Sequence, residues 1–371
     1  MSTPTTTPAP TATLLDSRSD PRTPRTQWTP LMITAGAIEE TFRALEDGDP
    51  DVRGRREALI VHPQAPAGVR GLAPATQVAL GVLLPGEQTV TTRDNTTGLG
   101  MCLAGEGVLA VGERTMRLTQ QDVWTKPTMS LETIRNEGTA PYHYIRYSNA
   151  ALLESISAFY EDYGGRAAAD AEPAPTSGAR AKDLAPAIPL GEDGSQLLPY
   201  EHLIDPDYVE DLPLHFPWSA VGQHLSGVLG LTTGYTGRPL YVLYNPATGR
   251  LNGTTPSFFA TITAVGGRFD GGTHRHMSSA INYHFAGRGY SIVEGERFDW
   301  GPGDLMLSAP GWAAHAHRIG EEGARILTVQ DHPLHTSTGS LVWQEDIENG
   351  EILALGAQAG FETNLATFGS R

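Results

Sequence analysis

The chain contains an internal repeat, and this repeat restricts the fold more than any other feature of the sequence. Segment 105–127 reads GEGVLAVGERTMRLTQQDVWTKP, and segment 287–310 reads GRGYSIVEGERFDWGPGDLMLSAP. Matched residues stay 182 or 183 positions apart: Gly105 with Gly287, Glu113 with Glu296, Asp122 with Asp304, and Pro127 with Pro310. So steady an offset over a unit of strands and turns predicts two tandem copies of one β domain.

The residues around the repeat indicate what kind of domain is duplicated. Short runs of β-branched and aromatic residues, such as VALGVLLPG and FFATITAVGG, alternate with Gly, Pro, Asp and Asn. This pattern is typical of antiparallel strands joined by short turns. Helical periodicity is limited to segments 33–48, 151–164 and 217–228, which we expect to form outer helices. The predicted fold class is therefore all-β, with two tandem domains and flanking helices.

Two stretches that are poor in large apolar residues divide the chain. Residues 1–29 are mostly Thr, Pro, Ala and Ser, a composition that favours a disordered tail. Residues 164–200 are rich in Ala, Pro, Gly and charge, which is typical of a linker. We therefore expect an N-terminal domain over 30–163, a C-terminal domain over 201–346 and a C-terminal extension over 347–371.

Charge and cysteine content exclude several classes of partner and site. The 371 residues carry a formal net charge of −16, which disfavours binding to nucleic acid and to anionic membranes. The single cysteine, Cys102, cannot form an internal disulfide or a cysteine-based metal cluster, so any metal must be bound by His, Asp or Glu. The sequence shows neither the pattern of a signal peptide nor a run of about 18 apolar residues. These features predict a soluble, cytoplasmic protein.

Histidines cluster in the second half of the chain, where seven of the twelve lie between His274 and His335. His274 and His276 are two residues apart, a spacing that places both side chains on one face of a β-strand. His315 and His317 repeat this spacing at a point where a turn would lead into a strand. If the two strands lie opposite each other, three imidazoles can converge.

Three convergent imidazoles suggest a metal site, with His274, His276 and His315 as the candidate ligands. Neutral imidazole suits Fe, Ni, Cu, Zn and sometimes Mn, and three histidines on one face of the ion leave positions for water, substrate or O₂. His317 is not needed as a ligand, so we expect it either to transfer protons or to support a metal ligand from outside the coordination sphere. The alternative is that it only packs in the core.

Four nearby residues are candidates for binding substrate: Trp312, Arg318, Arg288 and His284. The ring of Trp312 either lines the cavity or packs in the β core. His284 and the two arginines face either the pocket or solvent, and arginines are mostly solvated. The sequence leaves these alternatives open.

Five motifs surround or precede these residues: HRHMSSA (274–280), GRGYSIVEGERFDWGPGD (287–304), PGWAAHAH (310–317), NPATG (245–249) and FPWSA (216–220). With these motifs the sequence resembles the gentisate dioxygenase family of bicupins. This family also includes the enzymes that cleave the rings of 1-hydroxy-2-naphthoate and salicylate. The resemblance covers most of the chain, from Gln27 to Asp346.

The resemblance implies two cupin domains, each a double-stranded β-helix or jelly roll. It also implies one Fe(II) bound by the three candidate histidines, a small-molecule substrate, O₂, and assembly as a homodimer or homotetramer. At offsets of 182 and 183 the first domain has Thr92, Asp94 and Glu132 in place of the histidines. The family generally carries its working metal in the N-terminal cupin. Because this chain has no histidine triad there, we expect a degenerate N-terminal site, with a hard-metal site at Asp94 and Glu132 as the alternative.

These observations predict a non-haem Fe(II)-dependent dioxygenase of aromatic compound metabolism. Its substrate would be a small metal-chelating aromatic hydroxy- or amino-acid, with ring cleavage like that of gentisate or salicylate. One alternative is a cupin metalloenzyme with other chemistry: oxygenation of a non-aromatic or N-hydroxylated metabolite, or an isomerase or lyase that uses Zn, Mn or Ni. A second alternative is a bicupin that binds a ligand through its metal without turning it over.

Overall fold

The structure is a computed structural model that describes residues 12, 16, 18, 27–164, 186–190, 192–204, 211–228 and 240–356. Most of the expected tail (1–29) and parts of the expected linker (164–200) and extension (347–371) lie outside the described residues. Within the described part of the chain, no helix is long and apolar enough to cross a membrane.

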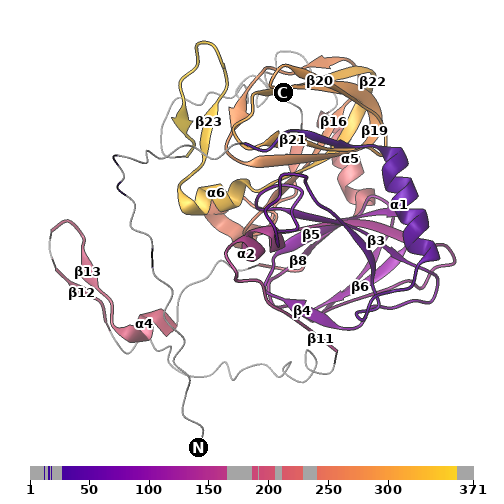
Figure 1. The fold of residues 1–371 in the computed structure, drawn as a ribbon, viewed down its shortest axis with the longest axis horizontal. Coiled ribbons are helices and arrows are strands. Elements are labelled where there is room, and N and C mark those ends of the chain that lie inside the picture. The colour runs from indigo at the N-terminus through magenta and orange to yellow at the C-terminus, as the bar shows by residue number, and fades with distance from the viewer. Residues whose placement is uncertain are drawn as a thin grey trace, which may run out of the picture.

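The N-terminal β domain consists of two antiparallel sheets that pack against each other (Figure 1). The first sheet has the strand order β14 (His215–Phe216), β8 (Val123–Lys126), β5 (Gly98–Ala104), β10 (Tyr142–Ser148), β3 (Gln77–Leu83) and β2 (Arg56–Ile60). The second has the order β11 (Glu161–Tyr163), β4 (Thr92–Asp94), β9 (Glu132–Arg135), β6 (Gly107–Val111) and β7 (Arg114–Leu118). The buried core between them takes Trp124 and Tyr144 from the first sheet and Leu109 and Ile134 from the second.

The C-terminal β domain is built around two long, paired strands, β19 (Ser279–Val293) and β22 (His315–Gln330). Register shifts between His284 and Ala286 and between Gly287 and Gly289 interrupt their pairing, and such irregularities bend strands. The sheet order is β1 (Leu31–Ile33), β21 (Leu305–Pro310), β19, β22, β16 (Phe259–Val265) and β15 (Leu240–Val242). The shorter strands of this half are β17 (Phe269–Asp270) on β22, β20 (Glu296–Trp300) on β19, and the separate sheet of β18 (Arg275–His276), β23 (Val342–Gln344) and β24 (Leu353–Ala354).

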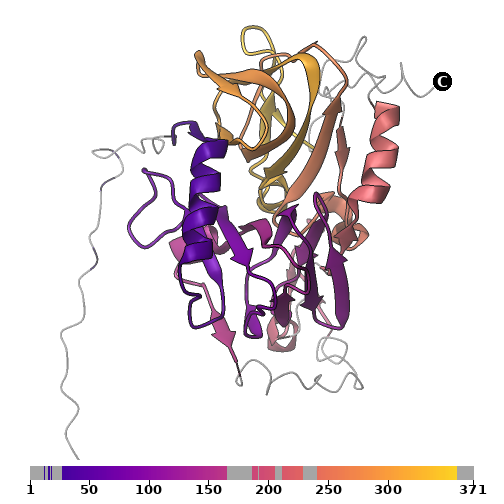
Figure 2. The ribbon, with the colours of Figure 1, turned by 90° about the vertical axis from the view of Figure 1, so that its right-hand side faces the viewer.

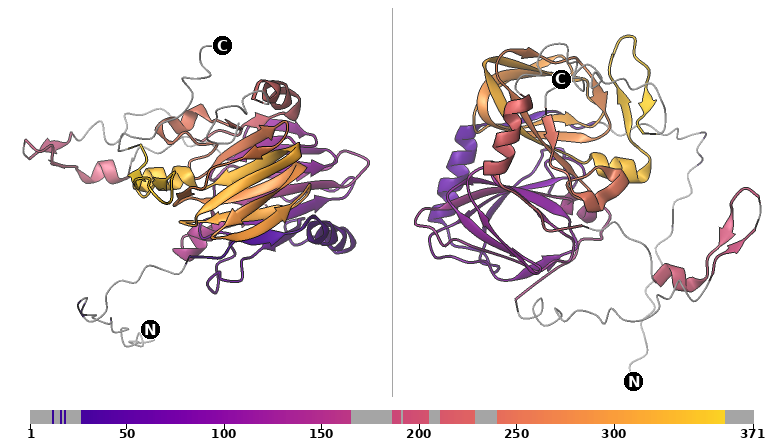
Figure 3. Two further views of the ribbon diagram at one scale, coloured as in Figure 1. Left: turned by 90° about the horizontal axis from the view of Figure 1, so that it is seen from above. Right: turned by 180° about the vertical axis from the view of Figure 1, so that it is seen from behind.

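Two of the three predicted helices form with nearly the expected bounds, as α1 (Ala35–Asp47) and α5 (Trp218–Val228). The helix expected over 151–164 is shorter, because α2 (Ala150–Ser155) ends where the chain turns to pair β11 with β4. The other short elements are α4 (Tyr200–Ile204), η2 (Pro246–Leu251), α6 (His332–Thr338) and the hairpin of β12 (Ile188–Pro189) and β13 (Gln196–Leu197). This hairpin and α4 stand apart from the two domains (Figures 1 and 3). The mostly β architecture with outer helices confirms the predicted fold class.

A shared apolar core joins the two domains, which lie one above the other (Figure 2). Successive residues of a strand point to opposite faces of its sheet. On β21, Met306 therefore packs inside the C-terminal domain, whereas Leu305 and Leu307 belong to the shared core. Leu80 of β3 and Ile262 of β16 enter the same cluster from the two domains. Each domain thus buries one sheet face against the other.

The domains also exchange short segments. Strand β1 precedes the N-terminal domain but pairs with β21 of the C-terminal domain, and β14 precedes the C-terminal domain but pairs with β8 of the N-terminal domain. A helix follows each exchanged strand, and a backbone N–H at the start of that helix donates to a repeated aspartate of the other domain. Asp304 accepts the N–H of Ala35 in α1 at 2.7 Å, and Asp122 accepts the N–H of Trp218 in α5 at 2.7 Å. Equivalent residues therefore hold an equivalent exchange in both directions.

The backbone explains two of the repeated residues. Gly105 and Gly287 both have positive φ, at 73° and 81°, in the region that disfavours side chains. Each also lies so close to a neighbouring carbonyl that a Cβ would collide with it. Each repeated aspartate also closes a turn of its own domain. Asp304 accepts the backbone N–H of Gly301, and Asp122 accepts the backbone N–H of Thr119.

We expect Asp304→Ala and Asp122→Ala each to lower the free energy of unfolding by about 3 kcal/mol, because each change leaves two backbone N–H groups without a charged acceptor. Urea denaturation measures the loss. Asp299→Ala is the control, because that side chain is 70% exposed and should change stability by less than about 0.5 kcal/mol. Losses no larger than that of the control would contradict this account of the exchange.

Candidate metal centre

An antiparallel bridge brings the two histidine motifs together. The backbone N–H of His274 donates to the carbonyl of His315 at 3.0 Å, and the N–H of His315 donates to the carbonyl of His274 at 2.8 Å. His276 lies two residues further along, so its side chain shares a face with that of His274. The bridge therefore places the three rings on one side of the backbone.

The three rings meet closely enough to bind one ion. One nitrogen from each of His274, His276 and His315 lies within 4.8 Å of the others. His276 and His315 are each 1% exposed, and His274 is half-buried. Among the described residues, no other group of three potential metal ligands lies this close together.

The main chain sets the tautomer of each ring. Nδ1 of His274 lies 3.2 Å from the carbonyl oxygen of Gly272, Nδ1 of His276 lies 2.8 Å from that of Ser278, and Nδ1 of His315 lies 2.9 Å from that of Ala313. A carbonyl oxygen only accepts hydrogen bonds, so each Nδ1 carries a proton and Nε2 is the ring nitrogen that can bind a metal. Metal-binding histidines commonly have this arrangement, in which the second nitrogen donates to a fixed acceptor. The donor set fits a divalent ion such as Fe, Co, Ni, Cu or Zn and leaves further coordination positions open.

Trp343 is a residue of this centre that the sequence analysis missed. Its ring lies 5.3 Å from that of His274 at an interplanar angle of 15°, and 4.7 Å from that of His276. Strand β23 positions it by pairing Trp343 with His276. The indole N–H donates to Glu345 at 3.1 Å. No spacing links Trp343 to the histidine motifs, since the contact depends on a short strand far along the chain.

His317 lies next to the candidate ligands, with its ring 5.6 Å from that of His315. It is 3% exposed, and its Nδ1 lies 2.8 Å from the Ser291 hydroxyl, which accepts the indole N–H of Trp300 at 3.1 Å. The Trp300 ring in turn stacks on buried His284 at 4.2 Å. His284 thus joins a row of buried rings that leads to the candidate centre.

Three further residues were predicted to bind substrate: Trp312, Arg318 and Arg288. Arg275 stacks over the ring of Trp312 at 4.6 Å, which holds Trp312 at the turn before His315. Arg318 donates to the carbonyl of Gly271 and lies 3.5 Å from Asp270. Arg288 is exposed.

A buried polar chain lies behind His276. The hydroxyl of Ser278 lies 3.1 Å from Nδ1 of His276 and donates to the side chain of Gln330 at 3.0 Å. The next residue, Asp331, accepts the backbone N–H of Ser279 at 2.6 Å. Burial raises the pKa of Asp331 to about 7, although this hydrogen bond acts in the opposite direction. The carboxyl group is therefore held partly protonated near neutral pH.

The N-terminal domain keeps the backbone of this site but not its ligands. Thr92 pairs with Glu132 across β4 and β9, as His274 pairs with His315. The three side chains at the ligand positions contact buried cations instead. Thr92 and Glu132 lie 2.7 and 3.5 Å from Arg55, and Glu132 also lies 2.8 Å from Arg146. Asp94 lies 2.7 Å from Lys126. The residues at the ligand positions of the N-terminal domain are thus paired with guanidinium and ammonium groups.

We expect the chain to bind one divalent metal ion, at the C-terminal site. His276→Ala should weaken the binding of Co²⁺ more than about 100-fold, because one of three ligands is lost. Asp94→Asn should leave the stoichiometry unchanged, and so should His224→Ala, which alters an exposed histidine of α5. Equilibrium dialysis with metal analysis measures all four proteins. A second ion that disappears in Asp94→Asn would show that the N-terminal site is functional.

The buried Asp331 should make stability depend on pH. Its native pKa of about 7 exceeds the ordinary value of 3.8 for an aspartate, so between these values the native state holds a proton that the unfolded chain releases. This group therefore destabilises the fold as pH rises across that window, by on the order of 3 kcal/mol. Urea denaturation at about pH 4.5 and about pH 7.5 should show a smaller loss in Asp331→Asn than in the wild type. Parallel changes in the two proteins would contradict the assignment.

The sequence comparisons give relatives of one kind, although no family model matches the chain. The chain is 28% identical over 284 residues to 1-hydroxy-2-naphthoate 1,2-dioxygenase from Nocardioides sp. (strain KP7), which covers 74% of this chain and 67% of the relative. It is 29% identical over 136 residues to 5-aminosalicylate 1,2-dioxygenase from Comamonas sp., or 36% of each chain. It is 31% identical over 94 residues to 5-nitrosalicylic acid 1,2-dioxygenase from Bradyrhizobium sp., or 25% of this chain and 45% of that enzyme. The chain thus spans less than two thirds of the last two relatives.

Solved structures show the same fold. The structure of salicylate 1,2-dioxygenase from Pseudaminobacter salicylatoxidans matches with a TM-score of 0.70 at 17% identity, over 91% of this chain and 92% of that chain. The structure of its adduct with gentisate matches with a TM-score of 0.68 at 16% identity, over 92% of this chain and 89% of that chain. The sequence relatives are dioxygenases, which confirms the expectation of an enzyme. The chain is therefore similar in sequence to 1-hydroxy-2-naphthoate and salicylate-type dioxygenases, and it shares the fold of salicylate 1,2-dioxygenase.

Proposed function

We propose that this protein is an Fe(II)-dependent ring-cleaving dioxygenase that acts in its C-terminal cupin. The observation that carries the proposal is the convergence of three histidines, each of which donates from Nδ1 to a main-chain carbonyl and so presents Nε2 as its metal-binding nitrogen. The relatives are named for salicylates and for 1-hydroxy-2-naphthoate, which share a hydroxyl group next to a carboxylate on an aromatic ring. We infer a substrate of this class, whose two neighbouring donors can chelate a metal.

An Fe(II) ion bound by His274, His276 and His315 would bring the substrate donors and O₂ to one centre, which would make the encounter of the two reactants intramolecular. The chain's own contribution is to hold the three ligands in place. The carbonyls of Gly272, Ser278 and Ala313 fix the three rings, and Trp343 packs against two of them. The half-buried indoles of Trp343 and Trp312 offer apolar walls for an aromatic ring.

His317 is our candidate for proton transfer. The Ser291 hydroxyl can donate its hydrogen to Nδ1 of His317, which places the ring proton on Nε2. A buried neutral imidazole beside the ligands can then deliver that proton to an oxygen atom of the reacting substrate. We further propose a cytoplasmic homodimer or homotetramer; a chain whose single cysteine, Cys102, forms no internal disulfide fits a reducing compartment.

The test is O₂ uptake by protein that has been loaded with Fe(II) without air. Gentisate, salicylate, 1-hydroxy-2-naphthoate, aminophenols and catechols form the substrate panel. We expect uptake matched to product with at least one acid, and loss of both metal and uptake in His276→Ala. His317→Gln should keep the metal and lower kcat by about 100-fold or more, because only proton transfer is lost.

His224→Ala serves as the matched control, since it removes an exposed histidine and should leave kcat unchanged. Uptake that persists in His276→Ala would overturn the assignment of the site. Bound metal without uptake on any member of the panel would instead favour other cupin chemistry or ligand binding without turnover. Turnover that continues without O₂ would exclude a dioxygenase.

A further inference from the structure

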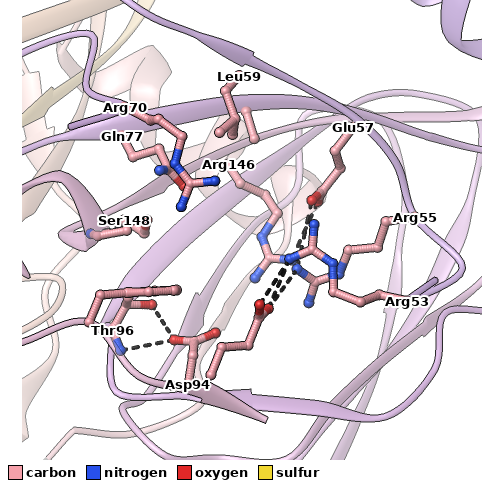
Figure 4. A pocket seen from close by; sticks show the side chains of 14 residues that line it. Arg53, Arg55, Glu57, Leu59, Arg70, Gln77, Asp94, Thr96, Arg146 and Ser148 are labelled. Atoms are coloured by element: carbon pink, nitrogen blue, oxygen red, sulfur yellow. Dashed lines mark hydrogen bonds and ion pairs between the residues drawn. The ribbon is translucent and has the colours of Figure 1, made fainter. Parts of the chain in front are cut away.

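The N-terminal cupin encloses a cavity of about 260 Å³ that the proposed reaction does not use (Figure 4). Its apolar wall consists of Leu59, Ala79, Ala150 and Phe159. The polar side of its lining includes Arg70, Arg146, Gln77, Ser148, Thr96 and Asp94. Arg70 is 54% exposed, whereas Arg146 is 15% exposed, so the cavity runs from an accessible arginine to a buried one.

The acidic groups around this cavity are already paired. Arg146 and Arg55 contact Glu132 and Glu57, and Lys126 binds Asp94. Burial raises the pKa of Glu57 and of Asp94, but the neighbouring cations outweigh burial and hold both values below the ordinary range. The carboxylates are therefore ionised, and each is paired with a neighbouring cation.

Hydrogen-bond donors remain beyond these pairs. Arg70 gives its Nε and Nη2 to Glu154, and among the described contacts its Nη1 has no acceptor. Arg146 gives its Nη groups to Glu132, and its Nε has no acceptor among those contacts either. The Gln77 amide and the Ser148 hydroxyl likewise donate to no described residue, although Ser148 accepts the N–H of Ala150 at 3.4 Å. Donors from two arginines, an amide and a hydroxyl thus line one small cavity (Figure 4).

We propose that this cavity is a second ligand site, independent of metal, that binds the carboxylate of a small organic acid. Charge-assisted hydrogen bonds from Arg70 and Arg146 would hold the carboxylate, with Gln77 and Ser148 as further donors. The apolar wall would cover the organic part of the ligand. The volume lies just below the range of about 300–1,000 Å³ for pockets that hold drug-sized molecules, so the acid must be small.

The surroundings favour a monoanion over a dianion. Glu57, Asp94 and Glu161 also line the cavity, and a second negative charge on the ligand would be repelled by them. A carboxylate therefore fits better than inorganic phosphate. The site is distinct from the histidine centre, because the residues that line it come from the N-terminal half of the chain.

The test uses full-length protein freed of metal, with calorimetric titration of benzoate and of acetate. Benzamide is the neutral isostere of benzoate, and inorganic phosphate is the competing oxyanion. We expect saturable binding of at least one carboxylate, and binding of benzamide and phosphate at least about tenfold weaker. Arg70→Gln should weaken carboxylate binding about tenfold or more, and Ser148→Ala should weaken it by a smaller factor.

Two controls separate this site from general charge effects and from the histidine centre. Arg43→Gln removes the same charge from an arginine of α1 that is 70% exposed, and should leave binding within about twofold. His276→Ala should also leave it unchanged, which distinguishes failure of this proposal from failure of the proposed reaction. The inference is overturned if neither acid binds up to about 10 mM, a limit that corresponds to a very weak site. It is also overturned if Arg70→Gln and Ser148→Ala bind like the wild type, if phosphate competes as well as benzoate, or if binding disappears in His276→Ala.

Discussion

Two hydrogen bonds hold the two cupins as one structure: each repeated aspartate accepts a backbone N–H at the start of the helix that follows an exchanged strand. Asp304 holds the start of α1, and Asp122 holds the start of α5, so each domain is completed by a segment that precedes the other. The shared core adds a second link, because each domain buries a sheet face against its neighbour. Loss of the N-terminal domain would remove β1 and expose the core of the C-terminal one. This dependence explains why a domain without a histidine triad still has a necessary role.

The two ligand sets show how one backbone frame accommodates different chemistry. The paired positions Thr92 and Glu132 repeat the geometry of His274 and His315, and only the side chains differ. Buried carboxylates are costly unless they are paired, so the change from imidazole to Asp94 and Glu132 requires fixed cations. Arg55, Arg146 and Lys126 supply them. At the position that matches Lys126, the C-terminal domain has Ala309, and its three neutral histidines require no such partner.

Much of the fold was predictable because the repeat and the β pattern are local signals. The steady offset of Gly105 and Asp122 from Gly287 and Asp304 reflects real constraints, namely positive φ at the glycines and shared acceptors at the aspartates. The exchange was not predictable, since β1 and β14 are too short to show periodicity. Trp343 and the cations around Glu132 were missed for a related reason: each reaches its site through a contact distant in sequence that no spacing encodes.

The absence of a carboxylate among the three candidate ligands has a consequence for the substrate. Three neutral imidazoles leave a divalent ion with its full positive charge, whereas a Glu or Asp ligand would cancel part of it. The acceptors on Nδ1 are main-chain carbonyls, which add no negative charge to the rings. The centre is also largely buried, and in such surroundings the remaining charge is poorly screened. An anionic chelating ligand compensates that charge better than a neutral one, which is a physical reason to expect an acid at this centre.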